Sequence, residues 1–188
     1  MLVHTCCAPC LTFPFLELSS KAPEILIYFY NPNIQPYAEY KLRRDCLEQY
    51  CLRQGIELIE GAYDFERFFQ DIILSESLRC SICYELRLSE AAKYAKHVNF
   101  DCFTTTLLVS PYQKHQIIRD VGEAIGEKFG IEFYYQDFRN GWKRTISISC
   151  ELGLYRQKYC GCLFSERERF YKPLKDQHQI IPKSISNK

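Results

Sequence analysis

The stretch Leu2-Val3-His4-Thr5-Cys6-Cys7-Ala8-Pro9-Cys10 places three cysteines within five positions, directly after a short apolar run. Its first residues predict a strand. Pro9 suits the first turn of a helix, where its missing N–H costs no hydrogen bond. Apolar residues at helical spacing then continue as far as Ser19-Ser20. The sequence therefore predicts a strand, a cysteine-bearing loop and a helix.

Four more strand-like runs follow, separated by helical patterns. The run at 25–30 is unbroken and apolar, which is typical of a parallel strand covered on both faces. The other runs lie at 56–60, 99–106 and 131–135, and helices are expected at 36–54, at 64–74, from Cys80, and from the cap pair Ser110-Pro111 to 129. This alternation predicts an α/β fold: a Rossmann-like parallel sheet of about five strands with flanking helices.

The alternation of strands and helices stops after Asp137. We therefore expect a Rossmann-like α/β domain at 1–137 and a C-terminal helical or irregular extension at 138–188, which completes a metal site and ends in a tail from about Pro173. In such a fold, ligands bind beyond the carboxyl ends of the strands. The first loop carries thiols where nucleotide-binding proteins have glycines, so nucleotide hydrolysis is not supported.

The composition is that of a globular protein. The 188 residues are 47% hydrophobic and 25% charged, which excludes a disordered chain, and a net charge of +1 excludes a globally basic nucleic-acid coat. No apolar run is long enough for a membrane span, and no signal peptide is evident, so we expect a cytoplasmic protein. In a reducing compartment, eleven clustered cysteines favour metal binding or catalysis over disulfides.

Two later cysteine pairs extend the first cluster. Cys80 and Cys83 should lie in the first turn of a helix, where the positive end of the helix dipole lowers the pKa of a thiol and favours metal ligation. Cys160 and Cys162 form a second pair. Together with Cys6, Cys7 and Cys10, these residues offer more sulfurs than the four that one 4Fe-4S cluster needs, so a second metal is conceivable.

Other chemistries remain open for these cysteines. Structural zinc usually presents two clean CxxC knuckles, and the adjacent cysteines and the CxC favour an iron–sulfur site instead. The segment 7–10 also resembles the redox turn of thioredoxin-like thiol oxidoreductases. Four further cysteines are expected to be packed or inert thiols: Cys46, Cys51, Cys102 and Cys150.

Candidate acids and RNA contacts lie near these motifs. We expect Cys6, His4 and Asp101 as catalytic candidates, although a histidine at a strand end and an aspartate beside a strand are often structural. Cationic and aromatic side chains that suit phosphate contact and base stacking occur at Tyr155, Arg156 and Lys158, and a second basic group at Arg43 and Arg44. A zinc-binding RNA adaptor is therefore a further alternative.

Five motifs together resemble the QueH-type epoxyqueuosine reductases, from His4 to about Tyr171. They are HTCCAPC at 4–10, YNPNIQPYAEYKLR at 30–43, RCSICYELRL at 79–88, FDCFTTTLLVSPYQ at 100–113 and ELGLYRQKYCGCLFS at 151–165. The resemblance implies reduction of the epoxide of epoxyqueuosine at the tRNA wobble position to the alkene of queuosine, without cobalamin. It does not identify the electron donor.

The same resemblance implies the cofactor and its ligands. It implies a 4Fe-4S cluster, allows a second, mononuclear iron, and matches the family's cysteine motifs to Cys6, Cys7, Cys10, Cys80, Cys83, Cys160 and Cys162. The remaining four cysteines fall outside these motifs. An iron with an open position could act on the epoxide oxygen as a Lewis acid while a nearby acid supplies a proton.

Overall fold

Five short parallel strands form the centre of the protein, in the order β3-β2-β1-β4-β5. The computed structural model describes residues 1–73 and 75–172. The strands are β1 (Leu2–His4), β2 (Leu26–Phe29), β3 (Glu57–Glu60), β4 (Cys102–Thr105) and β5 (Glu132–Phe133). The first, second and fourth strands are almost wholly buried, as expected where helices cover both faces of a sheet.

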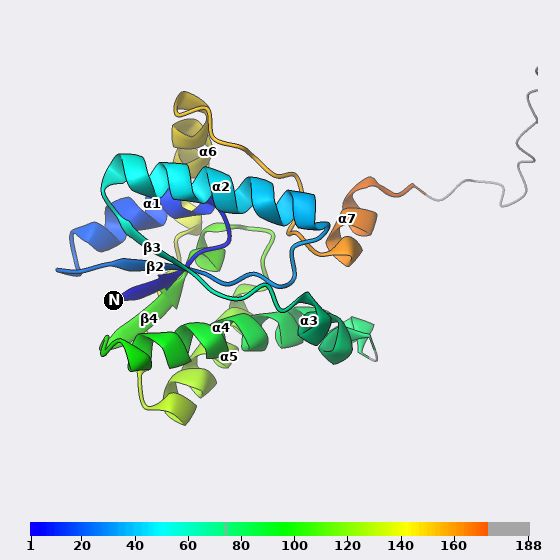
Figure 1. Ribbon diagram of the computed structural model, residues 1–188, viewed down its shortest axis with the longest axis horizontal. Coiled ribbons are helices and arrows are strands. Elements are labelled where there is room, and N and C mark those ends of the chain that lie inside the picture. The colour runs from blue at the N-terminus through cyan, green and yellow to red at the C-terminus, as the bar shows by residue number, and fades with distance from the viewer. Residues whose placement is uncertain (74, 173–188) are drawn as a thin grey trace, which may run out of the picture.

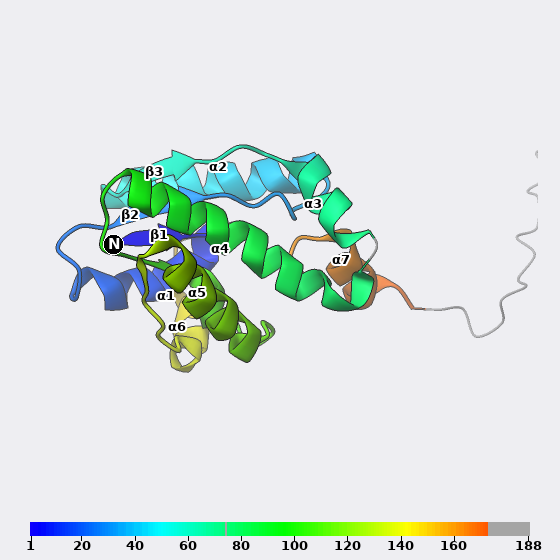
Figure 2. The ribbon, with the colours of Figure 1, turned by 90° about the horizontal axis from the view of Figure 1, so that it is seen from below.

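Helices cover both faces of this sheet, α1 and α2 on one and α4 and α5 on the other, while α6 packs against α1 and α3 against α4 (Figures 1 and 2). Their bounds are α1 (Ala8–Ser19), α2 (Tyr37–Gln54), α3 (Phe65–Ile72), α4 (Arg79–His97), α5 (His115–Phe129) and α6 (Trp142–Glu151). A further helix, α7 (Leu163–Phe170), lies near the amino-terminal end of α4 (Figures 1 and 2). The predicted α/β fold with a five-stranded parallel sheet is confirmed.

The position of β1 decides where a site can form. Leu2 pairs with Leu26 of β2 on one side and with Phe103 of β4 on the other. The chain continues from β1 toward β2 and β3 on one side, and the later strands β4 and β5 lie on the other side. The connections after β1 and β4 therefore lead to opposite faces of the sheet and leave a crevice beyond the carboxyl ends of these two strands. The cysteine loop 5–7 opens into this crevice.

One helix begins later than the sequence predicted. The helix expected to begin at Ser110-Pro111 begins at His115 instead. Ser110 forms a turn, in which its hydroxyl accepts from the Tyr112 N–H and its carbonyl from the Gln113 N–H.

The division into 1–137 and 138–188 stays a prediction, and the tail expected from about Pro173 lies outside the described residues. Within 1–73 and 75–172, no helix has the length and apolar character needed to cross a membrane.

The contact between α5 and β5 predicts a stability effect. A Cβ on Gly122 would lie 2.3 Å from a ring carbon of Phe133. Gly122→Ala should therefore lower the free energy of unfolding, because overpacking costs about 1–3 kcal/mol and the gain in helix propensity is only about 1 kcal/mol. Urea unfolding of both proteins measures the difference.

Ala124→Gly is the matched control, because Ala124 is exposed on the same helix and its substitution changes helix propensity alone. If Gly122→Ala were more stable than the wild type, close packing of α5 on β5 would be contradicted.

Candidate metal-thiolate site

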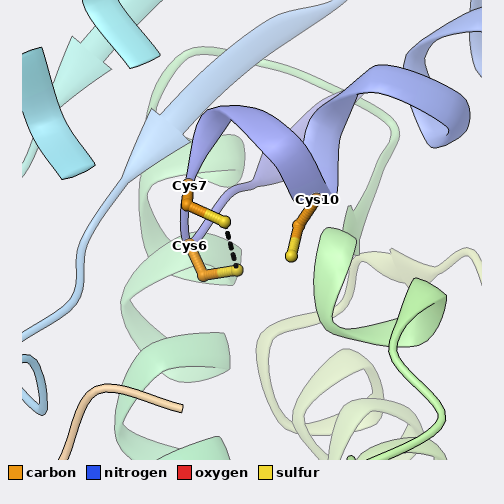
Figure 3. Close-up of side chains that lie close together, drawn as sticks. All are labelled: Cys6, Cys7 and Cys10. Carbon is orange, nitrogen blue, oxygen red and sulfur yellow. Dashed lines mark hydrogen bonds between the residues drawn. The ribbon is translucent and has the colours of Figure 1, made fainter. Parts of the chain in front are cut away.

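Three buried sulfurs converge at the amino-terminal end of α1. Cys7 precedes the first helical residue, Pro9 occupies the first turn as predicted, and Cys10 follows in the same turn. The Sγ atoms of Cys6, Cys7 and Cys10 all lie within 4.8 Å of one another, and those of Cys6 and Cys7 are 3.7 Å apart (Figure 3). In the described part of the chain, no other group of three or more potential metal ligands converges in this way.

The three thiols differ in the direction of their pKa shifts. Hydrogen bonds from Cys10 and Cys7 lower the pKa of Cys6 well below its usual range, and the guanidinium groups of Arg87 and Arg43 add to this shift. Burial raises the pKa of Cys7, and the hydrogen bond with Cys6 raises that of Cys10. Cys6 is therefore the most readily ionised of the three thiols, and binding a metal would release protons from the other two.

Residues from neighbouring loops hold this cluster at the crevice. Thr106, directly after β4, accepts from the Cys6 N–H at 3.3 Å and donates its hydroxyl to the Cys6 sulfur at 3.8 Å. Asn31, after β2, donates to the carbonyl of Thr5 at 2.9 Å. The loops that follow β2 and β4, the two strands beside β1, thus hold the first loop in place.

The four remaining predicted ligands gather at the same end of the sheet. The charges of Cys160 and Cys162 act on Cys83, and Arg79 lies near both Cys80 and Cys162. Their sulfurs do not converge to the distances found in the first cluster. The structure therefore brings the two later pairs together as neighbours, without drawing them into one closed set of ligands.

The electrostatic expectation for the Cys80/Cys83 pair is wrong for Cys83. Both residues do lie near the start of α4, which begins at Arg79. The helix dipole was expected to lower the pKa of these thiols, yet burial raises the pKa of Cys83 to about 12 despite the nearby cation of Arg87. Burial disfavours the thiolate more strongly than one helix end and one cation favour it.

Arg87 is a buried cation between the two groups of cysteines. Its side chain is 1% exposed and donates to Asn31 Oδ1 at 2.6 Å and to the Cys83 sulfur at 3.8 Å, while its Nε has no partner among residues 1–73 and 75–172. The ionisable groups whose charge would act on it are the cysteines 83, 6 and 160. A buried guanidinium needs compensating negative charge, and here sulfur rather than carboxylate is the available source.

A second buried arginine fixes the Cys160 segment. Arg43 pairs with Glu39 at 2.7 Å and donates to the carbonyls of Cys160 at 2.9 Å and Tyr159 at 3.3 Å. It is 1% exposed. The prediction that Arg43 contacts RNA is therefore wrong, because its guanidinium is used inside the protein to hold the C-terminal cysteines against α2.

Gly161 completes this attachment. Its φ of +130° suits glycine, and a Cβ would lie 2.9 Å from Ile34 Cγ1 and 3.2 Å from Arg43 Nη1. Its carbonyl accepts from the Gln35 N–H at 2.8 Å. The middle residue of the Cys-Gly-Cys motif must therefore be small for Cys160 and Cys162 to reach this position.

A cavity of about 530 Å³ opens onto the cysteines. Cys6, Cys10 and Cys160 contribute to its wall, together with the amide side chains of Gln113 and Gln157. Gln157 donates to the Cys7 sulfur at 2.7 Å, and Gln113 donates to the Cys160 sulfur at 3.5 Å. A substrate in this cavity would therefore face the sulfurs and two amide groups.

Neither acid candidate is placed for catalysis. His4 is fully buried, with Nδ1 2.8 Å from the Thr105 hydroxyl and Nε2 3.1 Å from the Tyr30 carbonyl, and burial lowers its pKa to about 3. Its ring is neutral and bonded on both sides, so it positions β1 instead of supplying protons. Asp101 precedes β4 and is exposed at the amino edge of the sheet, roughly 13 Å of strand away from the site edge. The expected catalytic roles of His4 and Asp101 are therefore not supported.

The other basic and aromatic candidates divide between two places. Arg156 and Lys158 line the cavity near the cysteines. Tyr155 is 37% exposed and donates its hydroxyl to Glu39 at 2.5 Å. Arg44 of α2 instead pairs with its neighbour Asp45 at 2.8 Å and with Glu60 of β3 at 3.3 Å, so carboxylates already engage its guanidinium. Of these candidates, those in the segment 155–158 lie beside the cysteine site, and Arg44 does not.

Sequence reasoning missed several side chains that shape the site. Arg87 follows Cys80 by seven positions and Cys83 by four, so helical spacing placed it on the same face, and this signal was available. The others lie within the quoted motifs, but their roles depend on tertiary contacts that the sequence does not show: Asn31, Thr106, Gln113 and Gln157.

Comparison with known proteins finds one family. The family profile described as Epoxyqueuosine reductase QueH matches residues 1–168. A protein of that name from Dehalococcoides mccartyi is 37% identical over 174 residues, which cover 92% of this chain and 96% of that protein. One from Thermotoga maritima is 35% identical over 90% of this chain and 91% of its own length. One from Helicobacter pylori is 35% identical across the whole chain, which spans 57% of that protein.

The convergence of the triad predicts a loss of metal on substitution. Cys10→Ser replaces a soft sulfur ligand by a hydroxyl, so the protein should retain less thiophilic metal per chain after anaerobic reconstitution. Cys150→Ser is the control, because Cys150 is exposed and lies outside the triad. Metal analysis by mass spectrometry measures both variants, and wild-type content in Cys10→Ser would remove Cys10 from the ligand set.

Proposed function

Because the chain belongs to the QueH family of epoxyqueuosine reductases, we propose that it reduces the epoxide of epoxyqueuosine in tRNA to the alkene of queuosine, at a metal–thiolate centre and without cobalamin. The observation that carries this proposal is the triad of buried sulfurs, two of which, Cys6 and Cys10, line an open cavity. As an oxidoreductase acting on tRNA, the enzyme would work in the cytoplasm.

The donor set fits a metal–thiolate centre. We assign Cys6, Cys7 and Cys10 to it, with Cys80, Cys83, Cys160 and Cys162 as the further ligands. Thiolates suit iron–sulfur clusters, and seven sulfurs exceed the four of one cluster, which leaves ligands for a mononuclear iron. When bound, a 4Fe-4S cluster supplies single electrons and an iron with an open position supplies Lewis acidity.

The protein's own residues prepare the site for this chemistry. Arg87 and Arg43 place two buried cations against the sulfurs, which favours thiolates over thiols. The amides of Gln113 and Gln157 face the cavity and restrict the orientation of a bound substrate. Removal of the epoxide oxygen as water consumes two electrons and two protons, so one product water forms for each electron pair that an external donor delivers.

The basic side chains at the cavity also support binding of the RNA substrate there. Arg156 and Lys158 line the cavity, so phosphates beside an inserted base would meet cations there. Tyr155 lies on the same segment but its hydroxyl is committed to Glu39. We therefore retain Arg156 and Lys158 as RNA contacts and assign Tyr155 to holding the segment.

A direct assay tests the activity. The anaerobically reconstituted protein, given tRNA that carries epoxyqueuosine and a chemical reductant, should form one queuosine for every two electrons consumed, as measured by nucleoside mass spectrometry. Cys150→Ser should retain this activity, and Cys10→Ser should lose it. Metal-loaded wild-type protein that leaves the epoxide unchanged would refute the proposed function.

Salt dependence tests the phosphate contact of Arg156. Arg156→Ala should reduce the slope of log affinity against log salt concentration by about one. The loss of affinity should therefore be larger at low salt than at high salt. Binding is measured by fluorescence anisotropy with labelled tRNA across a salt titration.

Arg53→Ala is the matched control, since Arg53 is exposed in the last turn of α2, at the other end of that helix from the Glu39–Arg43 pair. An unchanged slope in Arg156→Ala would exclude Arg156 from the phosphate contacts.

A further inference from the structure

An exposed aromatic pair stands at the cavity. Tyr112 is 81% exposed, and the edge-to-face contact with Trp142 has ring centroids 6.0 Å apart at 84°. Both residues line the cavity that contains Cys6 and Cys10. Trp142 begins α6, whereas Tyr112 lies in the turn before α5. Two distant segments thus bring aromatic rings to the entrance of the same site.

The turn that carries Tyr112 is fixed by the site itself. Ser110 accepts from the N–H groups of Tyr112 at 3.3 Å and Gln113 at 3.2 Å. The Gln113 side chain accepts from the Tyr84 hydroxyl at 2.8 Å and donates to the Cys160 sulfur at 3.5 Å. The backbone that carries Tyr112 is therefore held in place before a ligand arrives, which reduces the entropy lost on stacking.

The cavity wall also carries cations. Arg156, Lys158 and Arg169 line the cavity with the aromatic pair. The one carboxylate among the lining residues, Glu168, is paired with Arg79. Positive charge together with an open aromatic face is the combination that binds single-stranded nucleic acid, with phosphates on the cations and a base on the ring.

We propose that Tyr112, supported by Trp142, is a stacking platform for an unpaired RNA base adjoining the nucleotide that enters the cavity. This proposal rests on the proposed function, because that function supplies RNA as the substrate. Tyr112 lies in the entrance and not in the sulfur cluster, so it positions the RNA and takes no part in the reduction. Ser110-Pro111-Tyr112-Gln113 thereby gains a role as an RNA-holding turn.

Affinity measurements with the metal-loaded protein test the platform. Tyr112→Ala should weaken binding of an unmodified tRNA transcript by roughly 5- to 150-fold, the range reported for loss of one stacked base. Tyr112→Phe keeps the ring and should bind within about twofold of the wild type. With the modified tRNA, the loss in Tyr112→Ala should appear in KM and leave kcat unchanged.

A matched control and a folding check separate stacking from general damage. Leu52→Ala removes a side chain that is also 81% exposed but lies outside the cavity, so it should bind normally. Metal content and the thermal unfolding midpoint of Tyr112→Ala should equal those of the wild type. Wild-type affinity in Tyr112→Ala would overturn the platform.

tRNAs that lack one base identify which base stacks on Tyr112. Abasic tRNAs, one for each nucleotide flanking the modified position, are titrated against wild type and Tyr112→Ala. At one flanking position the wild type should lose affinity while Tyr112→Ala loses none, because the ring is already gone. Equal losses in both proteins at every position would reject stacking on Tyr112.

The outcomes for platform and function are distinguishable. Epoxide reduction by the wild type, with unchanged affinity in Tyr112→Ala, would reject the platform and leave the proposed function standing. RNA binding that depends on Tyr112, without epoxide reduction, would support the platform and reject the function.

Discussion

The site depends on two arginine cations buried among sulfurs. Arg87 and Arg43 are each 1% exposed, and the groups around them include Cys6, Cys83 and the backbone of Cys160. Taking a guanidinium out of water is costly unless negative charge accompanies it. Arg43 has Glu39 as a partner, but Arg87 has thiols and an amide. The two cations therefore offset part of the burial that raises the pKa of most of these thiols, and a bound metal would take the sulfurs in their deprotonated form.

The sheet brings these groups together from distant parts of the chain. The first loop follows β1, where the strand order changes direction, and Thr106 beyond β4 bonds to Cys6. Arg87 of α4 acts on both Cys83 and Cys6 from one layer, and Arg43 of α2 holds the Cys160 segment from the other. The first loop thus supplies the converged sulfurs, and the rest of the fold supplies charge, further thiols and a cavity.

Much of this arrangement was predictable from local patterns, and the rest was not. Pro9 and the apolar runs predicted the first helix and the parallel sheet, because periodicity reports burial directly. The helix expected at Ser110-Pro111 starts later, since Ser110 caps a turn in place of the helix. Arg43 and Asp101 were misjudged because charge in a sequence does not tell whether a side chain faces solvent, a partner or the wrong edge of a sheet.

Metal content tests most directly whether the cysteines form the proposed iron–sulfur centre. Protein purified without oxygen and fully active should contain iron together with acid-labile sulfide, with more than four irons per chain if a mononuclear iron accompanies the cluster. Iron that stops at four would remove the second metal and keep the cluster. Fully active protein that contains zinc, or no metal at all, would contradict the account.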